Sequence, residues 1–180
     1  MTSLRPCLLF GALIGCAAPG TVSSDGDAAT PFSPDECKAS LDAKATLTVG
    51  AGQTTYADIE DGTVLTWEKG PQGGHHVWLA VSQRGLRRRG SILTVDLEDV
   101  EDASAPKLVN HSRVVYDFSA PAAAGGSCTL TGLRMQLDNA GGVTLAELLG
   151  HHVRVTAVLR DTDGAQAMGA RTIVVRGAFD

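Results

Sequence analysis

From about residue 45 onward, apolar residues recur at every second position in short runs, and this alternation restricts what the chain can fold into. One run sets Val77, Leu79 and Val81 against Trp78 and Ala80. Further runs with the same period cover residues 45–49, 63–67, 93–98, 114–118 and 153–160. Successive side chains of a strand point to opposite faces, so a period of two is typical of a half-buried strand. Short runs of this kind, separated by Gly, Pro and Asp, predict an antiparallel sandwich or barrel.

Local signals refine this prediction. Residues 161–164, Asp-Thr-Asp-Gly, predict a hairpin turn between the last two strands. The parity of the apolar positions changes between Leu130 and Leu133, and a bulge at Gly132 would return both to one face. Short helical turns are expected only at residues 36–44 and 145–149.

The amino end has the organisation of an export signal. Residues 1–15 carry one positive charge, Arg5, followed by an apolar stretch about half the ~20 residues that span a bilayer. The stretch ends in Leu-Ile-Gly-Cys at residues 13–16, which resembles the lipobox of bacterial lipoproteins. The resemblance implies cleavage before Cys16, a diacylglycerol on its thiol and an acylated amine. The alternative is an ordinary secretory signal with small residues at its cleavage site.

The resemblance also implies a location. Ala17, rather than Asp, follows Cys16, and in the lipoprotein family this implies sorting to the outer membrane. Several acyl chains hold a protein stably at a membrane, whereas one does so only marginally. Residues 16–36 are rich in Ala, Pro, Gly, Ser, Thr and Asp and predict a flexible linker, which leaves residues 37–180 as the folded domain. Periplasmic and surface orientations both remain open.

The cysteines divide between these parts. Of four cysteines, Cys7 leaves with the signal peptide and Cys16 takes the lipid, so Cys37 and Cys128 remain. In an oxidising compartment this pair predicts a disulfide bond. The alternative is two separate buried thiols, and neither cysteine has a second one close enough in sequence to suggest a metal site.

Two further resemblances concern the folded part. Residues 148–177 are similar to the closing hairpin of bacterial immunoglobulin-like domains, which implies an all-β, antiparallel immunoglobulin-like β-sandwich. Residues 49–52, 59–62 and 70–78 are similar to a group of bacterial lipoproteins without an assigned function. Those proteins combine a lipobox, an acidic-Gly turn and a Gln-Gly-Gly-x-His segment, whose histidine falls on His76 here.

The turn before His76 predicts a structural role for that histidine. Consecutive glycines, Gly73 and Gly74, suggest backbone angles that residues with a Cβ resist. We expect His76 to lie beside Trp78 on the face opposite Val77. There its ring would hydrogen-bond a backbone group or the amide of residue 72 and lock the turn.

Five histidines raise the question of a metal site. Imidazole binds copper and zinc well, and the candidate ligands are His76, His111 and His152. Neighbouring residues on a strand point to opposite faces, so each His-His pair offers at most one ligand to a face. No carboxylate or cysteine stands at ligand spacing, so we expect no metal or other cofactor.

Charge is concentrated in two runs. The basic run could grip phosphate groups of a polyanion or be a solvated loop tip, and it comprises Arg84, Arg87, Arg88 and Arg89. Acidic residues between 98 and 102 could balance it. The net charge of −5 excludes the basic profile of a non-specific nucleic-acid binder.

No nucleophile elbow, zinc-protease helix, phosphate loop or dinucleotide fingerprint is present, so we expect no enzyme, although an unrecognised hydrolase stays open. The sequence predicts a lipid-anchored envelope lipoprotein that acts as a binding or structural surface module. Its partners would be the membrane, through the anchor, and a protein or envelope polymer. A lipoprotein that binds copper or zinc through histidines is the alternative.

Overall fold

The computed structural model describes residues 36–40, 42–71, 73–121, 126–138 and 143–177. The signal peptide, Cys16 and all but the last residue of the linker lie outside these ranges, so they remain predictions. Within the described ranges, no helix is long and apolar enough to cross a membrane.

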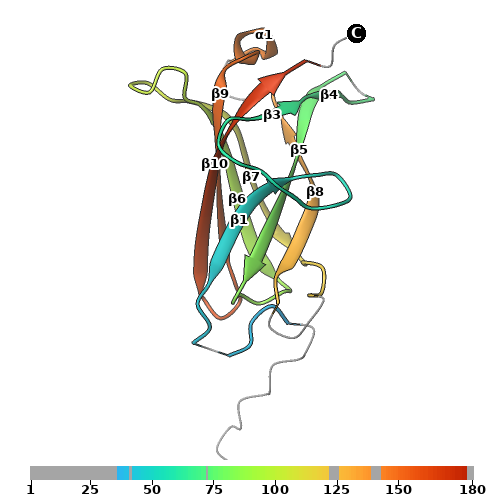
Figure 1. Ribbon diagram of the computed structural model, residues 1–180, viewed down its shortest axis with the longest axis vertical. Helices are drawn as coiled ribbons and strands as arrows, with labels where there is room; N and C mark the ends of the chain where they lie inside the picture. The colour runs from blue at the N-terminus through green and yellow to red at the C-terminus, as the bar shows by residue number, and fades with distance from the viewer. Residues whose placement is uncertain (1–35, 41, 72, 122–125, 139–142, 178–180) are drawn as a thin grey trace, which may run out of the picture. The chain divides into compact units, whose positions relative to one another are not determined.

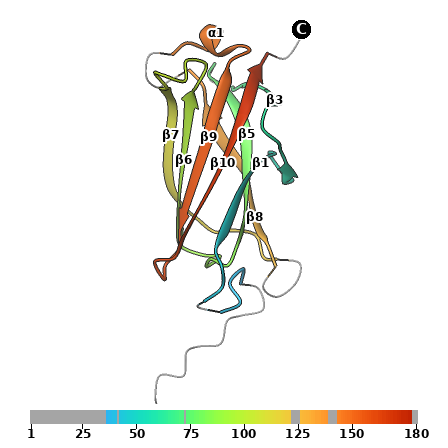
Figure 2. The ribbon, with the colours of Figure 1, turned by 60° about the vertical axis from the view of Figure 1, so that its left-hand side comes forward.

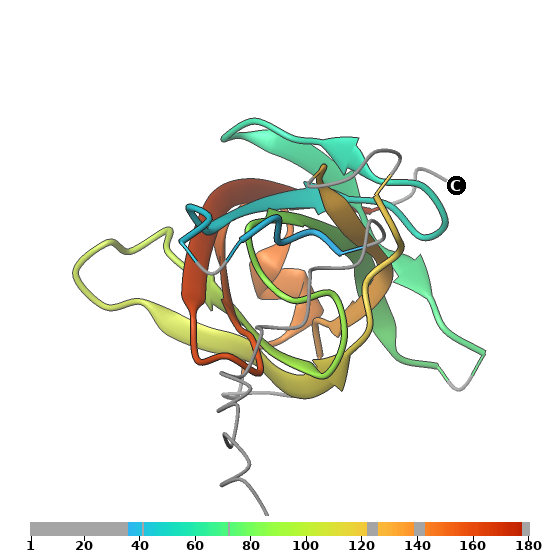
Figure 3. The same cartoon turned by 90° about the horizontal axis from the view of Figure 1, so that it is seen from below.

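In the described part of the chain, ten strands form two sheets that face each other, and one short helix, α1 (Leu145–Leu148), lies at one end (Figure 1). Sheet A contains β1 (Thr46–Ala51), β2 (Ala57–Asp58), β4 (Glu68–Lys69), β5 (His75–Arg84) and β8 (Cys128–Gln136). Sheet B contains β3 (Thr63–Thr66), β6 (Ser91–Asp99), β7 (Lys107–Tyr116), β9 (His152–Arg160) and β10 (Gln166–Arg176). Figure 3 shows the strands wrapping around a shared interior.

The connectivity is immunoglobulin-like. In sheet A, β5 lies between β1 and β8, and in sheet B the order is β3-β10-β9-β6-β7 (Figure 2). These paths correspond to strands A-B-E and G-F-C-C′ of an immunoglobulin domain. The short strand β3 adds to the second sheet by pairing in parallel with β10. The predicted all-β, antiparallel immunoglobulin-like sandwich is therefore confirmed.

The apolar residues that alternate in the sequence are the ones whose side chains face the core. Along β6, every second side chain is buried, and Leu93, Val95 and Leu97 are at most 3% exposed. The opposing strand β5 contributes Val77 and Leu79, which are also buried. Removing apolar surface from water stabilises the fold by about 25 cal/mol per Å². The core therefore consists of aliphatic side chains from the inner faces of both sheets.

The predicted bulge lies in β8. Opposite β5, Leu133 pairs with Leu79 and Leu130 pairs with Val81, so β8 has one extra residue between these pairs. Gly132 takes a positive φ of 72° there, which residues with a Cβ adopt at a cost. The extra residue keeps Leu133 on the core side, where it is 4% exposed.

Other local predictions are confirmed in part. Helix α1 and the hairpin turn at residues 161–164 are present. The helical turn expected within residues 36–44 is wrong for the described part of that segment, which is irregular because its first residues are held by contacts to other strands. Strand β7 begins at Lys107, seven residues before the apolar alternation predicted. Its first half is largely polar and lies at a sheet edge, so it carries no clear periodic signal.

Candidate functional site

A disulfide bond fastens the first described segment to the sandwich. Cys37 and Cys128 are joined, with their Cα atoms 5.7 Å apart, and both are at most 1% exposed. The carbonyl of Cys37 also accepts a hydrogen bond of 2.8 Å from the amide of Gly85, just after β5. The predicted disulfide is therefore present. We call this end of the sandwich, with the β5–β6 loop and the β9–β10 turn, the tether end.

Next to the disulfide, a lysine is buried against two aspartates. Lys38 is 2% exposed, and its Nζ lies 2.8 Å from Asp163 Oδ2 and 3.4 Å from Asp161 Oδ2. Burial lowers the pKa of Lys38, but the hydrogen bond to Asp163 and the charge of Asp161 outweigh it. The net result is a pKa above the ordinary value of 10.5. The hydrogen bond from Lys38 lowers the pKa of Asp163. Both groups therefore stay charged at neutral pH.

The carboxylate of Asp161 is fully occupied. Its Oδ1 accepts from the amides of Asp163 and Ala165, at 3.0 and 2.8 Å. Its Oδ2 accepts from the amide of Arg87 at 3.1 Å, in addition to Lys38. The side chain is turned inward and the residue is 5% exposed. Asp161 therefore holds the β9–β10 turn together and has no oxygen left for a neighbour on the surface.

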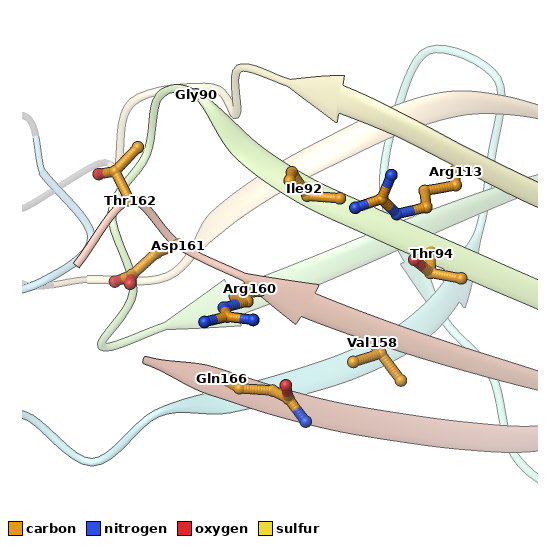
Figure 4. A pocket seen from close by; sticks show the side chains of 9 residues that line it. All are labelled: Gly90, Ile92, Thr94, Arg113, Val158, Arg160, Asp161, Thr162 and Gln166. Atoms are coloured by element: carbon orange, nitrogen blue, oxygen red, sulfur yellow. The ribbon is translucent and has the colours of Figure 1, made fainter. Parts of the chain in front are cut away.

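Immediately outside Asp161, the outer face of sheet B is hollowed (Figure 4). The hollow has a volume of about 370 Å³. We call it the arginine hollow, and it is lined by Gly90, Ile92, Thr94, Arg113, Val158, Arg160, Asp161, Thr162 and Gln166. Arg113 comes from β7 and Arg160 from β9, on either side of the β6 residues Ile92 and Thr94.

The electrostatics of the hollow are one-sided. Neither Arg113 nor Arg160 has an ion pair or side-chain hydrogen bond among the described residues. The carboxylates on the same face are already engaged: Asp96 lies 2.6 Å from the Nδ1 of His111, and Glu98 lies 2.7 Å from the guanidinium of Arg154. Asp117 is exposed at the rim of the hollow, where its Oδ1 accepts from the amide of Gly90 at 2.9 Å. Arg113 and Arg160 therefore face solvent with no direct carboxylate partner among the described residues. A carboxylate, phosphate or sulfate group is the ligand that guanidinium groups bind best.

Apolar side chains border these charges. Register places Met168 beside Val158 and Val115 beside Ile92. Met168 is 67% exposed and Val115 is 60% exposed. Arginine and methionine are enriched at protein interfaces, where apolar contact surrounds a few polar anchors. The arrangement therefore suits a ligand that combines an anionic group with apolar surface.

Arg84 ends β5, and the other three arginines of the basic run lie in the loop between β5 and β6, where Arg87 and Arg88 are partly buried rather than at a fully solvated tip. Arg87 Nε lies 2.9 Å from Asp163 Oδ2, and the amide of Arg88 donates to Glu36 at 2.9 Å. The expected balance with residues 98–102 is wrong, because those residues lie at and just beyond the opposite end of β6. Acidic groups of the β9–β10 turn and the first segment contact the loop instead.

The candidate metal ligands lie apart. His76 is on β5 in sheet A, His111 is on β7, and His152 is on β9 in sheet B. His152 Nδ1 lies 3.0 Å from a carboxylate oxygen of Glu101, and His111 has Asp96 as its partner. Across the described part of the chain, no three His, Cys, Asp or Glu side chains form a group that could hold a metal ion.

His76 lies beside Trp78, with ring centroids 4.8 Å apart and the planes at 86°. It is 4% exposed, and neither ring nitrogen has a hydrogen-bond partner among the described residues. The expected bond to a backbone group is therefore absent there, and residue 72 lies outside the described ranges. Burial, followed by the nearby charge of Arg134, lowers the pKa of His76.

The glycines before His76 serve different purposes. Gly73 has a φ of 94° and no neighbour close to where a Cβ would stand. At Gly74, the side chain of Gln136 occupies the place of a Cβ. Backbone conformation therefore favours glycine at the first position, whereas at the second a Cβ would displace the end of the flexible Gln136 side chain.

No protein-family model and no curated protein matches the chain. Among solved structures, murine CRIg is similar with a TM-score of 0.35 and 12% identity over 76% of this chain and 99% of that one. The CooA pilin subunit from enterotoxigenic Escherichia coli is similar with a TM-score of 0.34 and 14% identity over 74% and 99%. Likeness at this level carries no argument about function, and the fold assignment rests on the strand pairing described above.

Proposed function

We propose that this protein is a lipid-anchored envelope module that binds a partner protein through the outer face of sheet B, with an acidic group of the partner held in the arginine hollow. The observation that carries this proposal is the pair Arg113 and Arg160. Both face solvent in a hollow where Asp161, the one acidic residue among the described lining residues, already accepts from four donors. The proposal assigns no catalytic residue and no cofactor.

The apolar border favours a protein over a bare polyanion. A simple phosphate or sulfate site gains nothing from exposed Met168 and Val115, whereas a protein partner would bury them. At about 25 cal/mol per Å² of apolar surface, such contacts add affinity that arginines alone do not supply. Electrostatic attraction between the arginines and an acidic patch would also raise the association rate and make it sensitive to salt.

The location in the envelope rests on the predicted lipobox. The described domain begins next to Cys37, and the disulfide ties that point firmly to the sandwich. The chain that leads from a lipidated Cys16 would therefore join the domain at a point that the disulfide holds firmly in place. Palmitate labelling that disappears in Cys16→Ala would support this part of the proposal, whereas persistent labelling would contradict it.

The binding part can be tested on the mature lipoprotein in neutral detergent, with polyglutamate as the probe. The Arg113→Glu/Arg160→Glu variant should bind polyglutamate at least about tenfold more weakly than wild type, since two favourable charges become repulsive. The control is Arg134→Glu/Arg176→Glu, which makes the same charge change at exposed positions outside the hollow. Equal weakening by both variants would show that only net charge matters and would contradict the proposal.

A further inference from the structure

The strand that carries Arg113 has one unpaired edge. Sheet B ends at β7, which pairs with β6 on one side and with no other strand of the described residues (Figure 2). Its ten residues, Lys107–Tyr116, are long for an edge strand. Within the described residues, a side-chain bond across this side of the sandwich joins Asn110 Nδ2 to the carbonyl of Gln136 on β8, at 2.8 Å. A row of backbone donors and acceptors is therefore open to a further strand.

Side chains next to this edge are incompletely covered. Val114 lies directly opposite Leu93, so the two point to the same, core-facing side. Leu93 is 1% exposed, whereas Val114 is 46% exposed. The difference arises because β9 covers the far side of β6, whereas no strand of the described ranges pairs with the far side of β7. A strand added at this edge would place an apolar residue beside Val114 and extend the core.

Charge indicates what kind of strand fits. Among the ten residues of β7 there is no Asp or Glu, and the basic side chains Lys107 and Arg113 are both exposed. A second copy of β7 would bring like charges together, which destabilises cross-strand pairs. A segment with acidic residues would instead place a carboxylate opposite Arg113, at the rim of the arginine hollow.

We infer that the free edge of β7 takes up an extended segment of a partner protein, in which acidic and apolar residues alternate, as an added strand of sheet B. This inference rests on the proposed function, because the added segment would lie beside the arginine hollow. Main-chain hydrogen bonds would supply affinity, while the residues opposite Arg113 and Val114 would supply specificity.

The test uses a short acetylated and amidated peptide in which valine and glutamate alternate, added to the mature lipoprotein in neutral detergent. Hydrogen exchange of β7 backbone amides that face away from β6 should slow by about tenfold or more at saturating peptide. A matched peptide in which valine and lysine alternate should give no such slowing. Unchanged exchange along β7 with the glutamate peptide would overturn the inference.

Variants separate the edge from the hollow. Arg113→Glu should abolish the effect of the glutamate peptide, whereas Arg160→Glu, two strands away, should retain it. A further variant places a proline at Val114 or Val115, at the position whose N–H points away from β6. This change removes only an unpaired donor, so it should block peptide binding while the β6–β7 hydrogen bonds remain. Binding that survives this proline would count against strand addition.

Two outcomes distinguish this inference from the proposed function. If polyglutamate binding depends on the arginines but exchange along β7 does not respond to the peptide, the hollow stands and strand addition fails. If neither depends on them, both fail. Protection of β7 amides that appears without peptide and rises with protein concentration would identify a second copy as the occupant and overturn the assignment to a partner.

Discussion

Buried polar side chains near the two ends of strand β5 differ in whether their hydrogen bonds are made. At the tether end, Lys38 and Asp161 are buried charges, and each is held by several hydrogen bonds or ion pairs. At the distal end, where β4 and the turn at residues 70–74 lie, His76 is buried with neither ring nitrogen bonded within the described residues. The Nε1 of Trp67, in the same region, is also buried and unbonded there.

This difference in hydrogen bonding predicts that the tether end is more stable than the distal end. Buried polar groups stabilise a fold only when their hydrogen bonds are made, and an unmade bond costs about 1–3 kcal/mol. At the tether end the disulfide cross-links the first described segment to the sandwich, and the buried charges of Lys38 and Asp161 are paired and hydrogen-bonded. We therefore expect the distal end to open first on heating or in acid.

The largest effect should come from the disulfide. It closes a loop across 91 positions, and the chain-entropy model gives such a loop about 4–5 kcal/mol of stability. Cys37→Ala/Cys128→Ala should lower the free energy of unfolding in urea by about that amount, less any residual structure in the unfolded chain. A loss below about 1 kcal/mol would mean that the tether end does not depend on its cross-link.

The next largest effect should come from Lys38. Lys38→Met removes one partner of a buried ion pair, and such changes cost about 3–5 kcal/mol. Because Asp161 keeps three backbone donors, we expect about 3 kcal/mol, measured by urea unfolding. The control is Lys44→Met at an exposed lysine in the same segment, which should change stability by less than about 0.5 kcal/mol. Similar losses in both variants would contradict the importance assigned to the buried pair.

At the distal end, the turn glycine gives a smaller effect. Gly73→Val places a β-branched residue at a φ of 94°, which should cost about 1–3 kcal/mol of strain. Gly73 has open space around it, so the loss should reflect backbone conformation alone, and Gly73→Asn should recover part of it. A thermal unfolding midpoint equal to that of wild type for Gly73→Val would show that the turn relaxes without cost.

The smallest expected effect is a difference in how the distal end and the tether end lose stability as the pH falls. The pKa of His76 is lowered from 6.5, so the folded protein keeps this imidazole neutral at a pH where the unfolded chain is already protonated. The free energy of unfolding therefore decreases as the pH falls below 6.5. At the tether end, the pKa of Asp163 is lowered from 3.8, so its contribution is lost only as the pH falls below about that value. Between about pH 7 and pH 5, wild type should therefore lose stability that His76→Phe does not lose.

Urea unfolding at the two pH values measures this difference, and His111→Gln, an exposed histidine in the other sheet, controls for loss of an imidazole. Added Cu²⁺ or Zn²⁺ should not change the comparison. A metal-dependent rise of the wild-type midpoint that is absent in His76→Phe would instead make His76 a ligand.

The sequence predicted the fold better than the site, for a physical reason. Alternation within a strand reports which side chains face the core, so the sandwich, the bulge at Gly132 and the final hairpin could be expected. The half-polar start of β7 lies at an exposed edge, where burial imposes no pattern. The arginine hollow depends on which strands are neighbours. Arg113 and Arg160 are 47 positions apart in sequence and flank β6 only through register.

The basic run illustrates the same limit. Its arginines stand together in sequence and allowed either an anion site or a solvated loop tip, yet Arg87 is paired with Asp163 at the tether end. No sequence pattern reports that Asp161 is turned inward and saturated. As a result, Asp161 does not pair with Arg160, and this follows only from the folded turn.

In-cell photo-cross-linking from the hollow is the most direct test that the protein binds a partner there. A photoreactive side chain at Thr162, which lines the hollow and is exposed, should give a discrete adduct in the native protein. The adduct should disappear in Arg113→Glu/Arg160→Glu and persist in Arg134→Glu/Arg176→Glu at equal expression. An adduct of equal yield in all three backgrounds would contradict the assignment of the arginine hollow as the binding site.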